Sequence, residues 1–376
     1  MPQINALYAR FQALRNQAAD DGRFTVVSID ELPHKQGVSQ EGFPLFFVRT
    51  NSSASSVQNI VREILSVEYN VSCKLIDDNG NAQDDTFCII TLRSLDAPLQ
   101  SYFIEIFTMM LHRLQPIPSN RELSVEVENL IAIFDALTNP PKKKIQGLWA
   151  ELLVIEQSTQ PETLINAWHS VPSAKYDFTL GRDKIEVKST SSEERIHKFS
   201  LDQLNPSPNS RLLIASTVVR ESGPAADGLS VKGLYDKIRE RVSAVDSQIR
   251  LFTIIAETVG SDLAKLENVF YDYTSAVDFL EFYDYHDIPS ISKDAVPSLV
   301  TEVKFASNLN GLTDARKEES PFDMESSPLL AHRQTSVDNI SSSREMEVSL
   351  YDQRTFRYDT DRTSNSSTRG LPSLFS

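Results

Sequence analysis

A lysine and two carboxylates occupy positions from which they could act together. Asp177, Glu186 and Lys188 belong to residues 174–190, which read AKYDFTLGRDKIEVKST. Two short runs of strand-forming residues flank a Gly-Arg-Asp turn signal there, and this pattern predicts a β-hairpin. Because side chains alternate between the two faces of a strand, the three charged side chains are expected on one polar face.

The expected register follows from a two-residue loop, Arg182-Asp183, closed by Gly181 and Lys184. The opposed pairs are then Leu180 with Ile185, Phe178 with Val187, Thr179 with Glu186, and Asp177 with Lys188. A three-residue loop would scatter the apolar residues over both faces, which a half-buried hairpin resists. The two-residue loop is therefore preferred.

The chemistry open to this cluster is metal-assisted hydrolysis. Two neighbouring carboxylates, Asp177 and Glu186, repel each other, and a divalent cation relieves that repulsion. Oxygen ligands select hard ions such as Mg²⁺ or Mn²⁺. A lysine beside the ion, here Lys188, can hold an attacking water or offset negative charge on a phosphate. The alternative is a solvated face with a cross-strand salt bridge, which the hairpin alone favours because charged hairpins are abundant.

A helix is predicted upstream of the hairpin, over residues 143–157, KKIQGLWAELLVIEQ. Its apolar residues recur at the spacing of one helical face: Ile145, Leu148, Trp149, Leu152 and Leu153. This is the pattern of an amphipathic helix. Glu151 stands at the edge of the apolar stripe. The preceding run Lys142-Lys143-Lys144 is interpreted as a solvated linker rather than a phosphate contact.

The spacing Asp177, eight residues, Glu186, one residue, Lys188 resembles the PD-(D/E)XK motif of restriction-endonuclease-like nucleases. Tyr176 stands where that motif usually has proline. The segments GLWAELLVIE, YDF, IEVKS and HKFSLDQL are also similar to a bacterial family of PD-(D/E)XK proteins encoded beside phage-defence and restriction genes. The resemblance covers roughly residues 1–305 and is most specific at 144–204.

The resemblance implies a restriction-endonuclease-like αβββαβ core and a set of site residues. The expected ligands of Mg²⁺ (or Mn²⁺) are Asp177, Glu186 and Glu151, and Lys188 is the expected catalytic lysine. Gln203 matches a polar residue on the helix after the motif and is a candidate for substrate binding. His112, His169 and His197 are isolated in sequence, and a lone histidine is usually structural or solvated. His197, nine residues after Lys188, is kept as a supporting candidate for a phosphate contact.

Composition bounds the class of protein. The chain has 376 residues, 40% of them hydrophobic, and no apolar run long enough to span a membrane. Its net charge of −15 argues against a nucleic-acid binder, yet residues 142–220 hold eleven Lys/Arg and nine Asp/Glu, so the acidic excess lies elsewhere. The two cysteines, Cys73 and Cys88, are expected to be buried thiols rather than a disulfide. A cytoplasmic location fits these features.

The predicted fold class is α/β (α+β), in three parts. These are an N-terminal α+β module at 1–140, a nuclease-like core at 141–306 and a disordered, serine-rich tail at 307–376. Helices are predicted at 4–20, 99–114, 123–137, 143–157, 229–245 and 262–269. Strands are predicted at 24–29, 44–49, 65–75, 87–92, 211–219 and 249–257, the last from a continuous apolar run.

The leading functional hypothesis is a Mg²⁺-dependent DNA endonuclease in restriction or phage defence. DNA would be the substrate. The sequence leaves open whether the protein acts alone, as a homodimer or with partner proteins of a defence system. The alternative hypothesis is a nuclease-fold scaffold that has lost catalysis and serves as a specificity or assembly subunit. An intact Asp…Glu-x-Lys favours the enzyme, whereas the acidic surroundings favour the scaffold.

Overall fold

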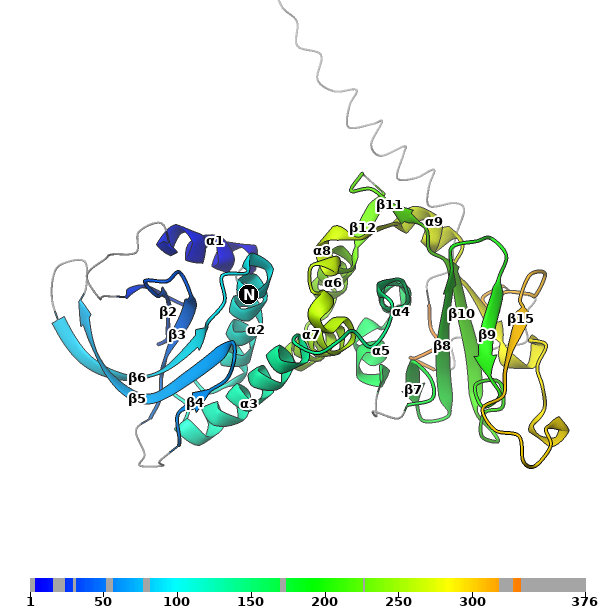
Figure 1. The fold of residues 1–376 in the computed structure, drawn as a ribbon, viewed down its shortest axis with the longest axis horizontal. Helices are drawn as coiled ribbons and strands as arrows, with labels where there is room; N and C mark the ends of the chain where they lie inside the picture. Colours follow the sequence, from blue (N-terminus) through cyan, green and yellow to red (C-terminus); the bar gives the residue numbers. More distant parts are fainter. Residues whose placement is uncertain are drawn as a thin grey trace, which may run out of the picture. The chain divides into compact units, whose positions relative to one another are not determined.

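The structure is a computed structural model that describes residues 4–15, 24–29, 32–51, 57–76, 82–169, 174–225, 227–317 and 327–332. All of these belong to one compact unit, residues 1–333 (Figure 1). None of the helices in these ranges combines the length and apolar character that a membrane crossing requires.

The N-terminal part is a six-stranded sheet with helices. The strands, in the order β1-β2-β3-β6-β5-β4 and all antiparallel to their neighbours, are β1 Thr25–Ser28, β2 Lys35–Val38, β3 Pro44–Arg49, β4 Ile60–Val61, β5 Leu65–Ile76 and β6 Ala82–Leu92. The helices are α1 Ile4–Arg15, α2 Ala97–Arg113 and α3 Asn120–Ala136. A capping box between Ser119 and Glu122 starts α3. Phe46 of β3 packs edge-on against Phe103 and Phe107 of α2, which joins sheet and helix in one core.

The C-terminal part is built around a second sheet, in the order β14-β10-β8-β7. Its strands are β7 Phe178–Leu180, β8 Asp183–Thr190, β10 Arg211–Val218 and β14 Glu281–Asp284. Strands β8 and β10 run parallel, and the other neighbours are antiparallel. The helices here are α4 Ile145–Gln157, α5 Pro161–Ala167, α6 Val231–Glu240, α7 Val245–Val259, α8 Lys265–Asn268 and α9 Tyr273–Asp278.

Shorter elements complete this part. Strands β9 Ile196–Ser200 and β15 Lys304–Asn308 pair with each other, and β13 Phe270–Asp272 lies between β11 Glu221–Ser222 and β12 Gly228–Ser230. Single 3₁₀ turns are η1 Gly260–Asp262, η2 Tyr285–Asp287 and η3 Lys293–Ala295.

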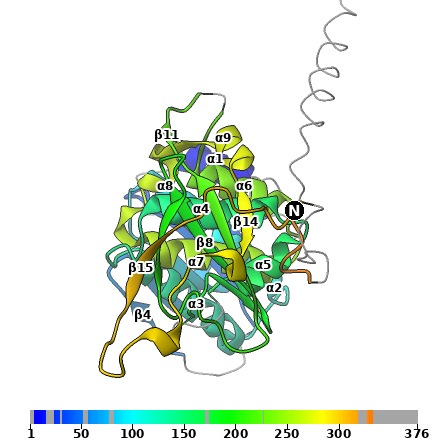
Figure 2. The same cartoon turned by 90° about the vertical axis from the view of Figure 1, so that its right-hand side faces the viewer.

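Strand β10 is buried on both faces and separates two layers. Leu213 and Ala215 join the main core with α4 and α6, whereas Leu212 and Ile214 join a smaller cluster with Phe199 of β9. This alternation is what a central strand covered on both sides requires. Figures 1 and 2 show α4 against one face of the sheet, in contact with β8, and the β9–β15 pair on the other side.

The mixed α/β fold class predicted from the sequence is confirmed, and most predicted elements are present within a few residues. Strand β3 has the predicted bounds. Helix α4 is the helix predicted at 143–157 and begins two residues later. Both cysteines are free thiols, Cys88 buried and Cys73 half-buried. The last turn of the helix predicted at 4–20 lies outside the described residues.

The strand predicted at 249–257 is wrong, because this segment forms α7. A continuous apolar run fits a buried strand and a buried helix equally well. Helix α7 packs against α2, α3, α4, α5 and α6, so that apolar residues are needed around most of its circumference. Helical neighbours on several sides, rather than a stripe facing one sheet, produced the misleading pattern.

The predicted start of the disordered tail, residue 307, is too early in the chain. Strand β15 continues to Asn308, and Leu309 is fully buried. Residues 327–332 return to the core, where Leu329 and Leu330 are fully buried and Thr159 donates its amide N–H to the Ala331 carbonyl. Two leucines suffice to dock so short a segment, although its composition is mostly polar. Residues 318–326 and 333–376 lie outside the described residues.

Candidate active site

A cleft of about 1050 Å³ is lined by residues of α3, α4, β8 and α7 and of the segments before α4, before β7 and after β9, together with Arg113 at the end of α2. It contains most of the predicted site: Glu151, Asp177, Glu186, Lys188 and Gln203. Two residues that were not predicted to belong to the site, Lys143 and His169, line it as well. The three carboxylates are each at most 8% exposed, so their charges sit at the buried end of the cleft.

The hairpin has the predicted faces but not the predicted register. Phe178 lies opposite Ile185 and Leu180 opposite Asp183, which is a shift of two residues from the expected pairing. The loop is therefore Gly181-Arg182, with Gly181 at φ +57°, a conformation that favours glycine at the first loop position. A shift by two keeps every side chain on its face, so the apolar pattern could not distinguish the two registers.

Asp177 is held by backbone groups on both sides. Its Oδ2 accepts a hydrogen bond from the Val187 amide at 2.8 Å, and its carbonyl accepts one from the His169 amide at 2.9 Å. The first contact ties Asp177 to strand β8, whereas Oδ1 remains directed at Lys143. The side chain is thus oriented before any ligand arrives.

Glu186, Lys188 and Gln203 form a second group in the cleft. Glu186 Oε1 accepts from Lys188 Nζ at 2.6 Å and from Gln203 Nε2 at 2.5 Å. Gln203 lies in a turn after β9, rather than on the predicted helix, and its Oε1 accepts from the Ser200 amide at 3.0 Å. Lys188 Nζ also stands 5.3 Å from the centre of the Phe199 ring. Gln203 therefore positions Glu186 in this structure.

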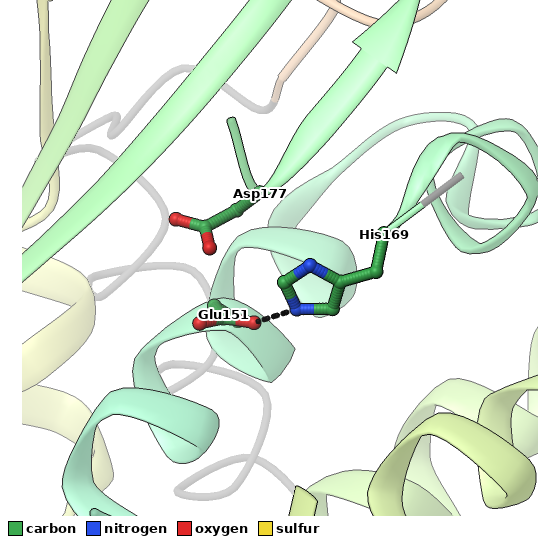
Figure 3. Close-up of side chains that lie close together, drawn as sticks. All are labelled: Glu151, His169 and Asp177. Atoms are coloured by element: carbon green, nitrogen blue, oxygen red, sulfur yellow. Dashed lines mark hydrogen bonds and ion pairs between the residues drawn. The ribbon is translucent and has the colours of Figure 1, made fainter. Parts of the chain in front are cut away.

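Glu151 projects from α4 into the same cleft, as Figure 3 shows with Asp177 and His169. Its Oε2 accepts from Trp168 Nε1 at 2.8 Å and lies 3.0 Å from His169 Nε2. Its Oε1 accepts from Lys143 Nζ at 2.7 Å, and Lys143 also reaches Asp177 Oδ1 at 3.1 Å. Lys143 is therefore bound in the site rather than solvated in a linker.

The electrostatics of the cleft are dominated by buried carboxylates. Burial, and then the charge of Glu151, raise the pKa of Asp177 to about 6. Burial, and then the charge of Asp177, raise the pKa of Glu186 to about 8. Burial acts upward on the pKa of Glu151 too, but His169 and Lys143 outweigh it and lower that pKa. Such crowding of acids is relieved by bound cations.

His197 does not belong to this cluster. Its side chain is 4% exposed on β9, and Nε2 lies 2.8 Å from Ser216 Oγ of β10. Burial, and then the charges of Lys188 and Arg195, lower its pKa to about 4. Its position, enclosed beside β10, gives no support to the predicted phosphate contact.

Sequence reasoning missed His169 and Lys143 for different reasons. His169 follows Trp168 in a stretch without a motif, and its backbone takes a positive φ of 41° that only the structure reveals. Lys143 is one of three consecutive lysines, and nothing in the sequence distinguishes it from Lys142, which pairs with Glu257. The direction of each lysine depends on how the chain enters α4.

The donor atoms present fit a divalent cation. Glu151, His169 and Asp177 each offer one ligand atom, and these atoms lie within 4.8 Å of one another. Carboxylate oxygens suit Mg²⁺ and Mn²⁺, and an imidazole nitrogen is accepted more readily by transition ions than by Mg²⁺. The Lys143 ammonium already stands among these atoms, so the site accommodates positive charge in this structure.

Comparison with known proteins gives one match. The sequence model of a family described as "Putative PD-(D/E)XK family member" (DUF4420) matches residues 20–310. No curated protein and no solved structure matches the chain. The matched region covers most of the chain and includes every residue of the cleft named above. The chain belongs to this PD-(D/E)XK family.

Proposed function

We propose that the protein is a DNA endonuclease that depends on Mg²⁺ or Mn²⁺ and acts in restriction or phage defence. One observation carries the proposal: Glu151, Asp177, Glu186 and Lys188 line one cleft, with three buried carboxylates next to a lysine. The combination of acidic metal ligands and a lysine is what phosphodiester hydrolysis requires.

Each residue has a role that its position supports. Asp177, Glu186 and Glu151 are the residues that would hold the metal, which when bound acts as a Lewis acid on the phosphate and favours an ionised water. Lys188 lies within 2.6 Å of Glu186 and offers its ammonium to the attacking water or the developing negative charge. Gln203 fixes Glu186 by a direct hydrogen bond.

DNA is the proposed substrate because the cleft carries positive charge beside its acidic centre. Arg113, Lys142, Lys175 and Arg250 line it together with the site residues, and Arg113 and Lys142 pair there with Asp246 and Glu257. Basic side chains of this kind neutralise the phosphate backbone of nucleic acids. Membership of the PD-(D/E)XK family supports the same substrate class.

A second candidate function is a nuclease-fold subunit without catalysis. The observation that favours it is the Lys143 ammonium between Glu151 and Asp177, which could neutralise these carboxylates permanently. Such a protein would serve a defence complex as a scaffold or specificity subunit. Metal binding separates the two candidates, because a permanent ammonium leaves no room for the ion.

The test is cleavage of supercoiled plasmid and phage DNA by the purified chain, with Mg²⁺, with Mn²⁺ and with a chelator. We expect metal-dependent nicking or linearisation that Asp177→Asn abolishes, together with weaker metal binding by this variant. Asp202→Asn is the matched control, since Asp202 is exposed and pairs with Lys293 outside the cleft. Absence of cleavage with both metals, also after addition of candidate partner proteins, would favour the scaffold.

A further inference from the structure

The Lys143 ammonium lies at a point that three possible ligand atoms share. Its Nζ is 2.7 Å from Glu151 Oε1, 3.1 Å from Asp177 Oδ1 and 3.4 Å from His169 Nε2. These distances exceed those of a metal bond by roughly 1 Å, which is the usual difference between hydrogen bonding and coordination. Small movements of the three side chains would therefore convert an ammonium site into a metal site.

The two carboxylates are oriented toward this point by groups other than Lys143. Trp168 Nε1 holds Glu151 through Oε2 at 2.8 Å, and the Val187 amide holds Asp177 through Oδ2 at 2.8 Å. In each case one oxygen is fixed by the fold and the other is left for a cation. Partners that orient ligands in this way are typical of metal centres.

The Lys143 side chain is positioned so that its ammonium can move out of the cluster. It precedes α4, its side chain is 38% exposed, and its four-carbon stem is flexible, whereas the Glu151 side chain is 5% exposed. The ammonium can therefore withdraw toward solvent without disturbing α4. Glu151 and Asp177 would then be left as an uncompensated buried pair, which a divalent ion would neutralise.

We propose that Glu151, Asp177 and His169 form a metal site in which His169 is a ligand and the Lys143 ammonium is the cation that the metal displaces. This inference rests on the proposed function, because it names the ligands and the metal preference of the same cleft. It also assigns a competitor within the chain, so that metal affinity is set by the release of Lys143.

The nitrogen donor has a consequence for metal choice. Mg²⁺ prefers oxygen ligands and gives up water reluctantly, whereas first-row transition ions accept imidazole readily. A site with two carboxylates and His169 should therefore bind Mn²⁺ more tightly than Mg²⁺. The same site without the imidazole should discriminate less between the two ions.

The first test measures Mn²⁺ affinity by titration calorimetry on the full chain without DNA. Lys143→Met removes the competing charge and keeps the length of the side chain, so we expect binding about fivefold tighter, the worth of a partly exposed ion pair. Lys144→Met is the matched control, because Lys144 is exposed and does not line the cleft, and it should leave the affinity unchanged. Unchanged or weaker binding by Lys143→Met would overturn the competition.

The second test identifies the ligand by pulsed electron paramagnetic resonance of bound Mn²⁺. We expect modulation from a directly bound ¹⁴N nucleus in the wild type, replaced by the ¹⁵N pattern when histidine is labelled. His169→Gln should abolish this modulation and lower the ratio of Mn²⁺ to Mg²⁺ affinity, whereas His286→Gln, at an exposed position on η2, should change neither. A wild-type spectrum without nitrogen coupling refutes the ligand role, even if His169→Gln does not fold.

The outcomes separate this inference from the proposed function. Mn²⁺ binding with nitrogen coupling but without DNA cleavage supports the metal site and contradicts the endonuclease. Metal-dependent cleavage with no nitrogen coupling to Mn²⁺ supports the endonuclease and refutes His169 as a ligand.

Discussion

Two buried carboxylate clusters in this protein differ in how their charges are balanced. Glu105 of α2 is 2% exposed, accepts from Tyr235 Oη at 2.7 Å and pairs with Arg239 of α6 at 3.1 Å. In the cleft, Glu151, Asp177 and Glu186 are about as buried. Burial of acids therefore does not by itself distinguish the candidate active site.

The difference lies in the nearest charges. Burial raises the pKa of Glu105, and the next largest influence, Arg239, opposes that rise. For Asp177 and Glu186 burial is followed by another carboxylate, which acts in the same direction. Glu105 is part of a closed structural contact between two helices, whereas at the centre of the cleft three buried carboxylates contact only two ammonium groups among the described residues, those of Lys143 and Lys188. Unbalanced charge next to a cleft is the feature that indicates function.

The largest expected effect on activity is loss of cleavage in Lys188→Ala. Removing a contact worth roughly 3 kcal/mol in the transition state would lower kcat a hundredfold or more. Metal and DNA binding should remain, because the carboxylates hold the ion. Lys184→Ala is the control, since Lys184 is on the same strand and bonds to the Gly181 carbonyl outside the cleft. Equal cleavage by wild type and Lys188→Ala would remove the nuclease assignment from this site.

The opposite result is expected at the other cluster. Glu105→Ala leaves Arg239 buried without its main partner, and chemical denaturation should show a loss of about 4 kcal/mol in unfolding free energy. The folded fraction should bind Mn²⁺ with unchanged affinity. The double variant Glu105→Leu/Arg239→Leu should recover much of the stability, and reduced metal affinity in either variant would blur the distinction between the clusters.

A third substitution, outside both clusters, tests whether stability can be lowered without a change in activity. Leu330→Ala creates a cavity under the segment 327–332, and denaturation should show a loss of about 3 kcal/mol. Cleavage per folded molecule should not change, because this leucine is not part of the cleft lining. Unaltered stability would mean that the segment contributes little to the core.

The smallest effect concerns pH and His332, an enclosed histidine in the same segment. Burial, reinforced by the charge of Arg316 and opposed by a hydrogen bond to Leu330, lowers its pKa to about 4. A depressed pKa means that stability is complete above pH 6.5 and is lost as the pH falls through 4, by at most about 3 kcal/mol. His332→Gln should reduce this acid loss in thermal melts.

The wild type and the His332→Gln variant have all other titrating groups in common. The raised pKa values of Asp177 and Glu186 make the folded protein more stable as the pH falls. The lowered pKa values of His34 and His197 make it less stable. The difference between wild type and His332→Gln therefore isolates one histidine. Identical acid profiles would show that His332 becomes solvated before it is protonated.

Local patterns were sufficient for much of the protein. Apolar spacing predicted α4, although residues 148–157 of this helix are buried on every side rather than along one stripe, and alternation predicted the two faces of the hairpin. Glu151 was placed beside the hairpin only by the family resemblance, but the order Asp177, Glu186, Lys188 on one face was readable from the residues themselves. These features depend on neighbours within a few residues or on the period of one element.

Only the tertiary structure decided the contents of the cleft and the packing around it. Lys143 and His169 enter the site because the chain before α4 and the chain after α5 both end beside Asp177, which no periodic pattern encodes. The same holds for α7, whose apolar run fits a strand as well as a helix and is helical because other helices surround it. It also holds for Leu330, which packs into the core from a mostly polar segment. The sequence determined which side chains share a face. Contacts between distant segments determined which charges oppose one another, because electrostatic partners are chosen by distance in space.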